Sequence, residues 1–201
     1  MAKNKLTKKK KKPTVKKKKL VTTQKKKTVK SSVKRKVNKT GAKPKKKKIL
    51  AIPQGYTELT AYLIVHDASQ AIEFYKKAFS AKETMRMEQP NGKVGHAELK
   101  IGNARIMLAD EYPEMNTRSP QSIGGTPVGI HLYTKNVDET VAKAVAVGAK
   151  LTRPVEDMFY GDRSGSLEDP YGHVWYVSTH IEDVTPAQIR KRAANLFGGK
   201  Y

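Results

Sequence analysis

The stretch YLIVHDASQAIEFYKKAF, residues 62–79, decides the fold of this chain, because it joins a strand pattern directly to a helix pattern. Residues 59–67 alternate apolar and mixed side chains, which predicts a β-strand. Residues 68–79 then place apolar side chains at helical spacing, which predicts an amphipathic helix. A strand followed at once by a helix points to a mixed fold of the α+β class.

Three further strands are expected after this helix, over residues 83–89, 94–101 and 104–110. Asn91-Gly92 separates the first two and is a strong hairpin turn sequence. Gly102-Asn103 supplies the second turn. Together with the first strand and helix, these segments predict a βαβββ unit.

The second half of the chain repeats this order with an offset of 69 residues. Leu63 matches Leu132, and the run Ile106-Met107-Leu108 matches Trp175-Tyr176-Val177. An internal repeat of this length predicts a duplicated structural module. The expected elements of the second copy are a strand at 128–134, a helix at 136–147 and strands near 151–155, 165–168 and 173–178.

A last helix is expected at the C-terminal end. Thr185 is its expected N-cap, Pro186 stands at the first helical position, and Gln188 completes a capping box. The expected domain map is a tail at 1–50, a domain at 51–185 with modules at about 57–112 and 126–180, and a C-terminal helix and tail at 186–201.

Charge divides the chain into two unlike parts. The 201 residues include 41 Lys and Arg against 18 Asp and Glu, a formal net charge of +23. Residues 1–50 contain 24 of the basic residues and no acidic residue, while residues 51–201 contain the other 17 and all 18 acidic residues. The absence of Cys excludes disulfide and thiolate chemistry, and no apolar run approaches the roughly 18 residues of a membrane span. We expect a soluble cytoplasmic protein, with a nucleoid-associated or nuclear location as the alternatives.

The tail is expected to be disordered, because its like charges repel and it has almost no apolar side chains to bury. Lysine suits phosphate rather than base readout, which predicts non-specific nucleic-acid binding. The alternative is a solubilising or anchoring tail. In composition the segment resembles the Lys-rich tails of histone-like proteins. The expected nucleic-acid contacts are Lys8, Lys9, Lys10, Lys11, Lys12, Lys16, Lys17, Lys18, Lys19, Lys45, Lys46, Lys47 and Lys48.

The repeated domain resembles the vicinal oxygen chelate (VOC) superfamily, which includes glyoxalase I, extradiol dioxygenases and bleomycin-resistance proteins. The resemblance rests on residues 62–79, 96–111, 124–150 and 160–177. The last of these, YGDRSGSLEDPYGHVWYV, is most similar to the PhnB-like subgroup. The resemblance implies two βαβββ modules whose curved mixed sheets surround a cavity, a small-molecule ligand and paired subunits, hence a homodimer.

Strand alternation separates the side chains expected under the helices from those expected to face the cavity. The side chains expected under the helices are the apolar ones. In the first strand of each module they are Leu59, Ala61, Leu63 and Val65, and Val128, Ile130 and Leu132. Arg163, in the sequence YGDRSG, is expected to pair with an anionic ligand, with a salt bridge to Asp162 or Asp169 as the alternative. The expected ligand cavity comprises Thr60, Tyr62, His96, Glu98, Met107, Gly129, His131, Tyr133, Arg163 and Tyr176.

The resemblance places the four metal-ligand positions of the family at Thr60, Met107, Gly129 and Tyr176. None of these is a His or a carboxylate, which a hard or borderline divalent ion requires. We therefore expect no family metal and no cofactor. The alternative is a divalent metal held by His96, Glu98 and His131, or a hydrogen-bonded network of the same residues.

Three functions follow from these patterns. The first is binding of a small aromatic or drug-like molecule without a metal. The alternative is a metal-dependent lyase, isomerase or dioxygenase, whose catalytic residues the sequence does not identify. The third is a dimeric platform that presents the cationic tails to nucleic acid.

Overall fold

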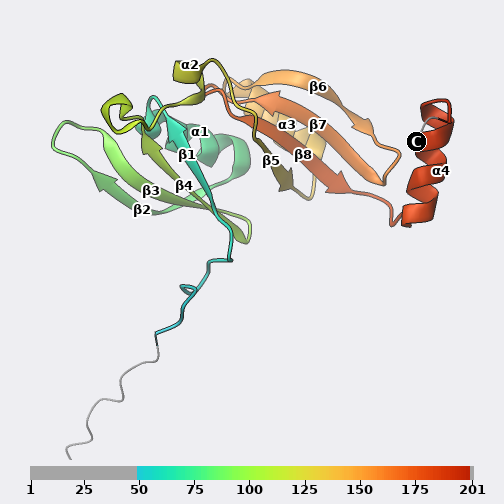
Figure 1. The fold of residues 1–201 in the computed structure, drawn as a ribbon, viewed down its shortest axis with the longest axis horizontal. Coiled ribbons are helices and arrows are strands. Elements are labelled where there is room, and N and C mark those ends of the chain that lie inside the picture. Colours follow the sequence, from blue (N-terminus) through green and yellow to red (C-terminus); the bar gives the residue numbers. More distant parts are fainter. Residues whose placement is uncertain (1–48, 200–201) are drawn as a thin grey trace, which may run out of the picture. The chain divides into compact units, whose positions relative to one another are not determined.

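The computed structural model describes residues 49–199, and the predictions made for residues 1–48, including every lysine contact, lie outside them. The first module contains a four-stranded sheet and one long helix (Figure 1). The sheet order is β1-β4-β3-β2, with β1 parallel to β4 and the other pairs antiparallel. Its elements are β1 (Ala61–Val65), α1 (Ala68–Phe79), β2 (Lys82–Glu88), β3 (Val94–Ile101) and β4 (Ala104–Asp110).

The second module repeats this topology with the order β5-β8-β7-β6. Its elements are β5 (Gly129–Tyr133), α3 (Val137–Ala146), β6 (Lys150–Asp157), β7 (Asp162–Glu168) and β8 (Val174–His180). The predicted α+β class and the two βαβββ modules are confirmed. The connection between the modules contains two short helices that the sequence did not predict, the 3₁₀-helix η1 (Pro113–Met115) and α2 (Pro120–Ile123).

The 69-residue repeat is visible in the strand register. Tyr62 in β1 pairs with Met107 in β4, and His131 in β5 pairs with Tyr176 in β8. The two pairs are related by 69 residues on both strands, so the duplication extends to single positions of the ladder. We therefore compare the modules residue by residue below.

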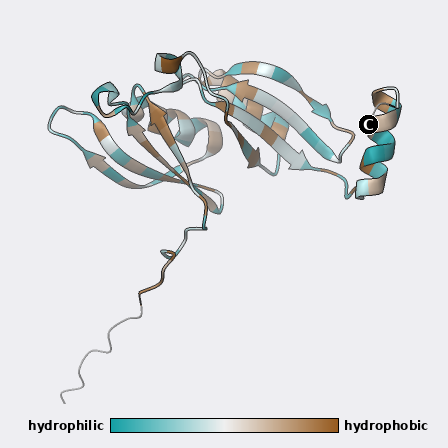
Figure 2. Ribbon diagram, viewed as in Figure 1, coloured by the Kyte–Doolittle hydropathy of each residue, from teal (hydrophilic) through white to brown (hydrophobic). Residues whose placement is uncertain are grey.

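Buried side chains join the two modules in one core. Trp175 of β8 packs against Phe79 and Tyr75 of α1, with ring centroids 4.6 and 5.6 Å apart. These aromatic pairs each contribute about 0.5–1.5 kcal/mol beyond the area that they bury. Figure 2 shows apolar and polar residues alternating along the strands, as expected for sheets with one covered face.

Two residues predicted under the helices are exposed instead. Leu59 is 87% exposed and Val128 is 65% exposed. The strands begin only at Ala61 and Gly129. Leu59 and Val128 therefore precede the ladders, where neither the sheet nor a helix covers them.

The C-terminal helix α4 (Pro186–Leu196) begins as predicted. Thr185 accepts a hydrogen bond from the backbone N–H of Gln188, and the side chain of Gln188 accepts one from the backbone N–H of Thr185. This reciprocal capping box satisfies two N–H groups that a helix start otherwise leaves unpaired. Among residues 49–199, no helix is long and apolar enough to cross a membrane.

Candidate functional site

Each sheet has one face away from its helix, which we call its open face. On the open face of module 1, Tyr62, Met107, Glu98 and Met85 form one row across four strands. Residues that lie directly opposite one another in a sheet point to the same side, so this row shares one surface. Ala97, the neighbour of Glu98 on β3, points the other way and is fully buried.

Hydrogen bonds connect the polar residues of this open face. The hydroxyl of Tyr62 lies 3.0 Å from Nδ1 of His96, and Nε2 of His96 lies 3.6 Å from Oε1 of Glu98. Nη1 of Arg105 lies 3.4 Å from the other oxygen of Glu98. A hydrogen bond with Tyr56 holds the pKa of Glu98 below its ordinary value, and His96 and Arg105 act in the same direction. Glu98 is therefore a carboxylate with several partners.

A segment before β1 covers part of the same face, which the sequence did not predict. The guanidinium of Arg105 lies 4.6 Å from the ring centroid of Tyr56 and donates from Nε to the carbonyl of Gly55 at 3.0 Å. A cavity of about 480 Å³ lies between this segment and the sheet, with Glu98 and Met107 in its wall. Tyr56 escaped prediction because it lies outside any strand or helix pattern.

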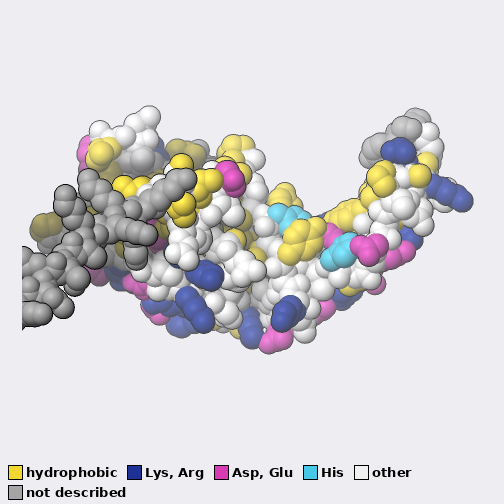
Figure 3. Space-filling view, turned by 90° about the horizontal axis from the view of Figure 1, so that it is seen from below, with side chains coloured by type: hydrophobic (Ala, Val, Ile, Leu, Met, Phe, Trp, Pro, Cys, Tyr) yellow, Lys and Arg dark blue, Asp and Glu magenta, His cyan; other side chains and the backbone are white. Residues whose placement is uncertain are grey.

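The open face of module 2 is aromatic. The rings of His131 and Tyr133 lie 4.7 Å apart, and those of His131 and Tyr176 lie 6.4 Å apart and nearly parallel. Tyr133 and Tyr176 are 62% and 42% exposed. Tyr133 donates a hydrogen bond to Oδ2 of Asp162 at 2.8 Å, which raises the pKa of its phenol. Figure 3 shows histidine side chains beside side chains of the hydrophobic class on this surface.

The four positions where the family holds its metal do not fit a divalent ion. Thr60 is half-buried just before β1, and Met107 offers a thioether. The ring of Tyr176 lies so close to Gly129 that a Cβ at residue 129 would collide with it. A metal-binding side chain at residue 129 is therefore excluded while Tyr176 keeps this position.

The alternative metal set is divided between the two sheets. His96 and Glu98 share β3, whereas His131 belongs to β5 and stacks with tyrosines there. Within residues 49–199 no group of three His, Cys, Asp or Glu side chains could hold a metal ion. His96 and Glu98 instead belong to the hydrogen-bonded network with Tyr62.

Arg163 does not lie with the other predicted cavity residues. It pairs with Thr179 in the register of β7 and β8, on the face that α3 covers. Its guanidinium donates to Asp138 at 2.8 Å and to Asp157 at 2.9 Å, and both carboxylates raise its pKa. The salt bridge expected as an alternative exists, but its partners are not Asp162 or Asp169.

The turn that begins at Asp169 is held by the side chain of this residue. Asp169 is buried and accepts hydrogen bonds from the hydroxyl of Tyr75 at 2.7 Å and from Nε1 of Trp175 at 2.9 Å. The backbone N–H groups of Tyr171 and His173 donate to its other oxygen. One carboxylate therefore links α1 to the turn before β8.

Two further histidines, His173 and His180, also have polar contacts. Nε2 of His173 lies 3.1 Å from the carbonyl oxygen of Ile64. His180 lies between two carboxylates, 2.7 Å from Asp162 and 3.0 Å from Asp183, and both raise its pKa. The contacts of His173 with Ile64 and of His180 with Asp162 each join residues that are distant in sequence.

Two βαβββ modules with open sheet faces define a glyoxalase-like domain. Residues 56–177 match the Glyoxalase/Bleomycin resistance protein/Dioxygenase superfamily, and the chain belongs to this family.

The chain is also similar to individual relatives and solved structures. An uncharacterized protein of Mycobacterium tuberculosis (strain ATCC 25618 / H37Rv) is 41% identical over 144 residues, which covers 70% of this chain and 85% of the relative. The X-ray structure of an Arabidopsis thaliana gene product has a TM-score of 0.51 at 28% identity and covers 61% of this chain and 98% of its own. The crystal structure of protein PA1353 from Pseudomonas aeruginosa has a TM-score of 0.53 at 20% identity over 63% of this chain and 99% of its own. This last likeness concerns the fold alone.

Proposed function

We propose that this domain binds a small aromatic or drug-like molecule without the divalent metal of the family. The observation that supports this most is the aromatic row of His131, Tyr133 and Tyr176 on the open face of module 2. Large rings that remain half-exposed on a sheet offer a stacking surface for a planar ligand. The phenol of Tyr133 is already oriented by Asp162, so the ligand meets a fixed ring.

The proposed ligand site includes the open face of module 1 and a second copy of the chain. Both open faces carry exposed apolar side chains, among them Tyr62, Met87 and Tyr176. Pairing of two copies would cover such surfaces and enclose the ligand. A homodimer is therefore part of the proposal, as is the PhnB-like subgroup, which rests on the sequence of residues 160–177.

The proposed role of the tail is sequence-independent binding of nucleic acid in the cytoplasm. Its support is the 24 basic residues among residues 1–50, against no acidic one. Each neutralised phosphate of duplex DNA contributes about −0.9 to the slope of log affinity against log salt concentration. Replacing Lys8 to Lys12 by Gln should make this slope shallower. An unchanged slope and affinity would contradict the role of these lysines.

Thermal unfolding with a library of planar aromatic compounds tests the ligand proposal. We expect stabilisers whose effect is lost in Tyr133→Leu and Tyr176→Leu and kept in Met115→Leu, because Met115 lies outside both sheets, on η1. Equal stabilisation of all variants would place the ligand elsewhere. The absence of any stabiliser would overturn the proposal.

The metal-dependent alternative has its own measurement. It requires His96, Glu98 and His131 to bind one ion. His96 and Glu98 belong to the sheet of module 1, whereas His131 belongs to that of module 2. Elemental analysis of protein purified without chelators, followed by dialysis against Zn²⁺ or Mn²⁺, would support this alternative only if close to one equivalent per chain is retained. Retention below about a tenth of an equivalent would reject it.

A further inference from the structure

Three methionines share the open face of module 1 with a histidine. Met85, Arg86 and Met87 of β2 pair in an unbroken antiparallel register with Glu98, Ala97 and His96 of β3. Met87 is thus directly opposite His96, and Met85 is opposite Glu98, with Cβ atoms about 4.5–5.5 Å apart in such pairs. Ala97 is buried under the helix, so Met85, Met87, His96 and Glu98 all point to the other side.

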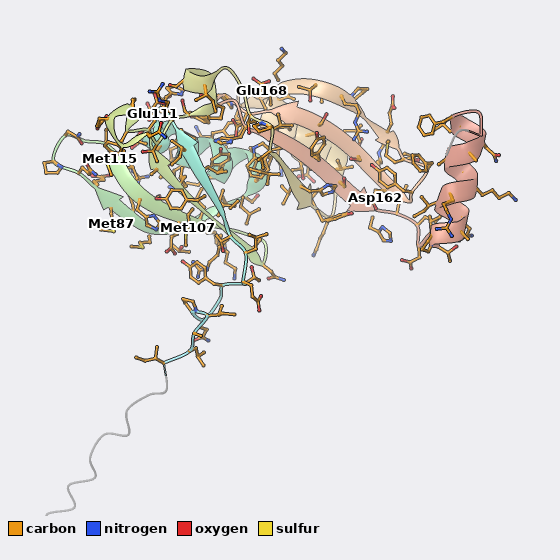
Figure 4. All side chains as sticks on the ribbon, viewed as in Figure 1. Met87, Met107, Glu111, Met115, Asp162 and Glu168 are labelled. Atoms are coloured by element: carbon orange, nitrogen blue, oxygen red, sulfur yellow. The ribbon has the colours of Figure 1, made fainter. Side chains whose placement is uncertain are left out.

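The third methionine reaches the same surface from β4. Met107 pairs with Glu98 across the β3–β4 ladder. It is therefore a diagonal neighbour of His96, a relationship of about 7–8 Å that long side chains can span. Figure 4 labels Met87 and Met107 on the sheet of module 1. Met87 and Met107 thus lie on the two strands that flank β3, which carries His96.

These side chains are accessible rather than packed in a core. Met85 is 40% and Met87 is 56% exposed. Thioether and imidazole are both ligands of soft ions, and thioether sulfur selects Cu(I) over the divalent ions that prefer oxygen. The carboxylate of Glu98 lies 3.6 Å from Nε2 of His96 and is shared with the guanidinium of Arg105 at 3.4 Å, so it is the thioether and imidazole ligands that favour a cation at this place.

The histidine is already oriented for ligation. Its Nδ1 lies 3.0 Å from the hydroxyl of Tyr62. In the tautomer whose Nδ1–H donates to this oxygen, Nε2 carries the lone pair, and a cation bound there would replace the 3.6 Å contact of Nε2 with Glu98. A partner on the second ring nitrogen is the usual arrangement for a metal-binding histidine, and its loss typically lowers metal affinity about 10–100-fold.

We propose that the open face of module 1 binds one monovalent soft cation, Cu(I) or Ag(I), through Nε2 of His96 and the sulfurs of Met85 and Met87, with Met107 as a further thioether. This site differs from the divalent site that the resemblance implies. It shares only Met107 with the four positions of that site. It does not depend on the aromatic ligand proposed for the chain, whose main contacts lie on module 2.

Methyl NMR of the full chain labelled with [methyl-¹³C]methionine tests the proposal directly. The chain has six methionines, and Ag(I) replaces Cu(I) without redox chemistry. We expect the methyl signals of Met85, Met87 and Met107 to shift and to reach their end points at one equivalent of Ag(I). The signals of Met115 and Met158 should stay in place. Equal shifts at Met115, or no shift at Met85 and Met87, would overturn the site.

Matched variants measure the affinity by competition with a Cu(I) chelator in the absence of oxygen. Met85→Leu combined with Met87→Leu should lower the affinity at least about tenfold, because leucine keeps a similar volume without sulfur. Tyr62→Phe should lower it about tenfold through the orientation of His96, and Met115→Leu should leave it unchanged. Thermal unfolding of each variant confirms that the fold is kept. Affinity that is the same in all variants would reject the proposal.

Discussion

The ring of Tyr176 in β8 lies directly over Gly129 in β5, in the space that a side chain at residue 129 would need. Both residues stand at positions that the resemblance assigns to metal ligands of the family. Gly129 provides room for the ring, and the ring prevents any larger residue at 129. A metal-binding side chain at residue 129 is therefore incompatible with this position of the Tyr176 ring.

The first prediction concerns this pair. Gly129→Ala should lower the free energy of unfolding by about 1–3 kcal/mol, the usual range for overpacking. The φ of Gly129 lies outside the left-handed region, so the loss should come from the collision with Tyr176. In a Tyr176→Ala background the same substitution should cost much less. Urea unfolding of the four proteins in this double-mutant cycle measures the difference, and equal costs in both backgrounds would contradict the prediction.

The second prediction concerns the carboxylate of Asp169. Asp169→Ala should destabilise the chain by roughly 3 kcal/mol or more, because each buried donor left unsatisfied costs about 1–3 kcal/mol. Four donors lose their acceptor, including the hydroxyl of Tyr75 and Nε1 of Trp175. Asp169→Asn should cost less, since it keeps one acceptor oxygen. Denaturant unfolding measures both.

Asp183 provides the control for this experiment. It is an exposed aspartate that contacts the side chain of His180. Asp183→Ala should change stability by no more than about 0.5 kcal/mol, as is usual for surface substitutions. A similar loss for Asp169→Ala and Asp183→Ala would show that the buried network contributes little.

Local patterns allowed much of the fold to be predicted. The helix at residues 68–79 has the predicted bounds, because its apolar spacing and the strand pattern directly before it agree. The capping box at Thr185 was equally explicit in sequence. Such features depend on residues within one helical turn or one strand, where periodicity and capping preferences act.

Features of the site that depend on contacts distant in sequence were not predicted. Arg163 was placed in a loop because β7 was expected to begin only near Gly165. The strand begins at Asp162, and the register then turns Arg163 toward Asp138, 25 residues away. The stacking of Tyr56 on Arg105 spans an even longer gap in sequence and follows no periodic pattern. Strand length and register decide both, and neither is visible in a single sequence.

The third prediction uses the repeat. In module 1 the backbone N–H of Ala68 donates to Asp110. In module 2 the backbone N–H of Val137 donates to Thr179. The two donors are 69 residues apart, and so are the two acceptors. Asp110 also accepts from the N–H of Val94. Asp110→Ala should therefore cost about 3 kcal/mol and Thr179→Ala about 1 kcal/mol, because bonds to a charged acceptor are worth more.

Asp110→Thr distinguishes the two bonds of Asp110. Threonine can replace the helix-start contact, as Thr179 does in module 2, but it cannot serve Val94 at the same time. Asp110→Thr should lower the free energy of unfolding, but by less than Asp110→Ala does. Chemical unfolding gives the order, and a cost for Asp110→Thr equal to that of Asp110→Ala would show that the repeat does not extend to this contact.

The last prediction concerns the pH dependence of stability at His180. Asp162 and Asp183 raise the pKa of this histidine above its ordinary value of 6.5. A raised pKa in the folded state means that the charged imidazole stabilises the fold below pH 6.5, and that this contribution is lost as the pH rises through the folded pKa. NMR titration of the His180 ring should give a pKa above 6.5 in the native chain and a lower one in Asp162→Asn. In that variant the contribution of His180 to the free energy of unfolding should change less between pH 6 and 8. An unchanged pKa of His180 in Asp162→Asn would show that Asp162 does not stabilise the charged imidazole.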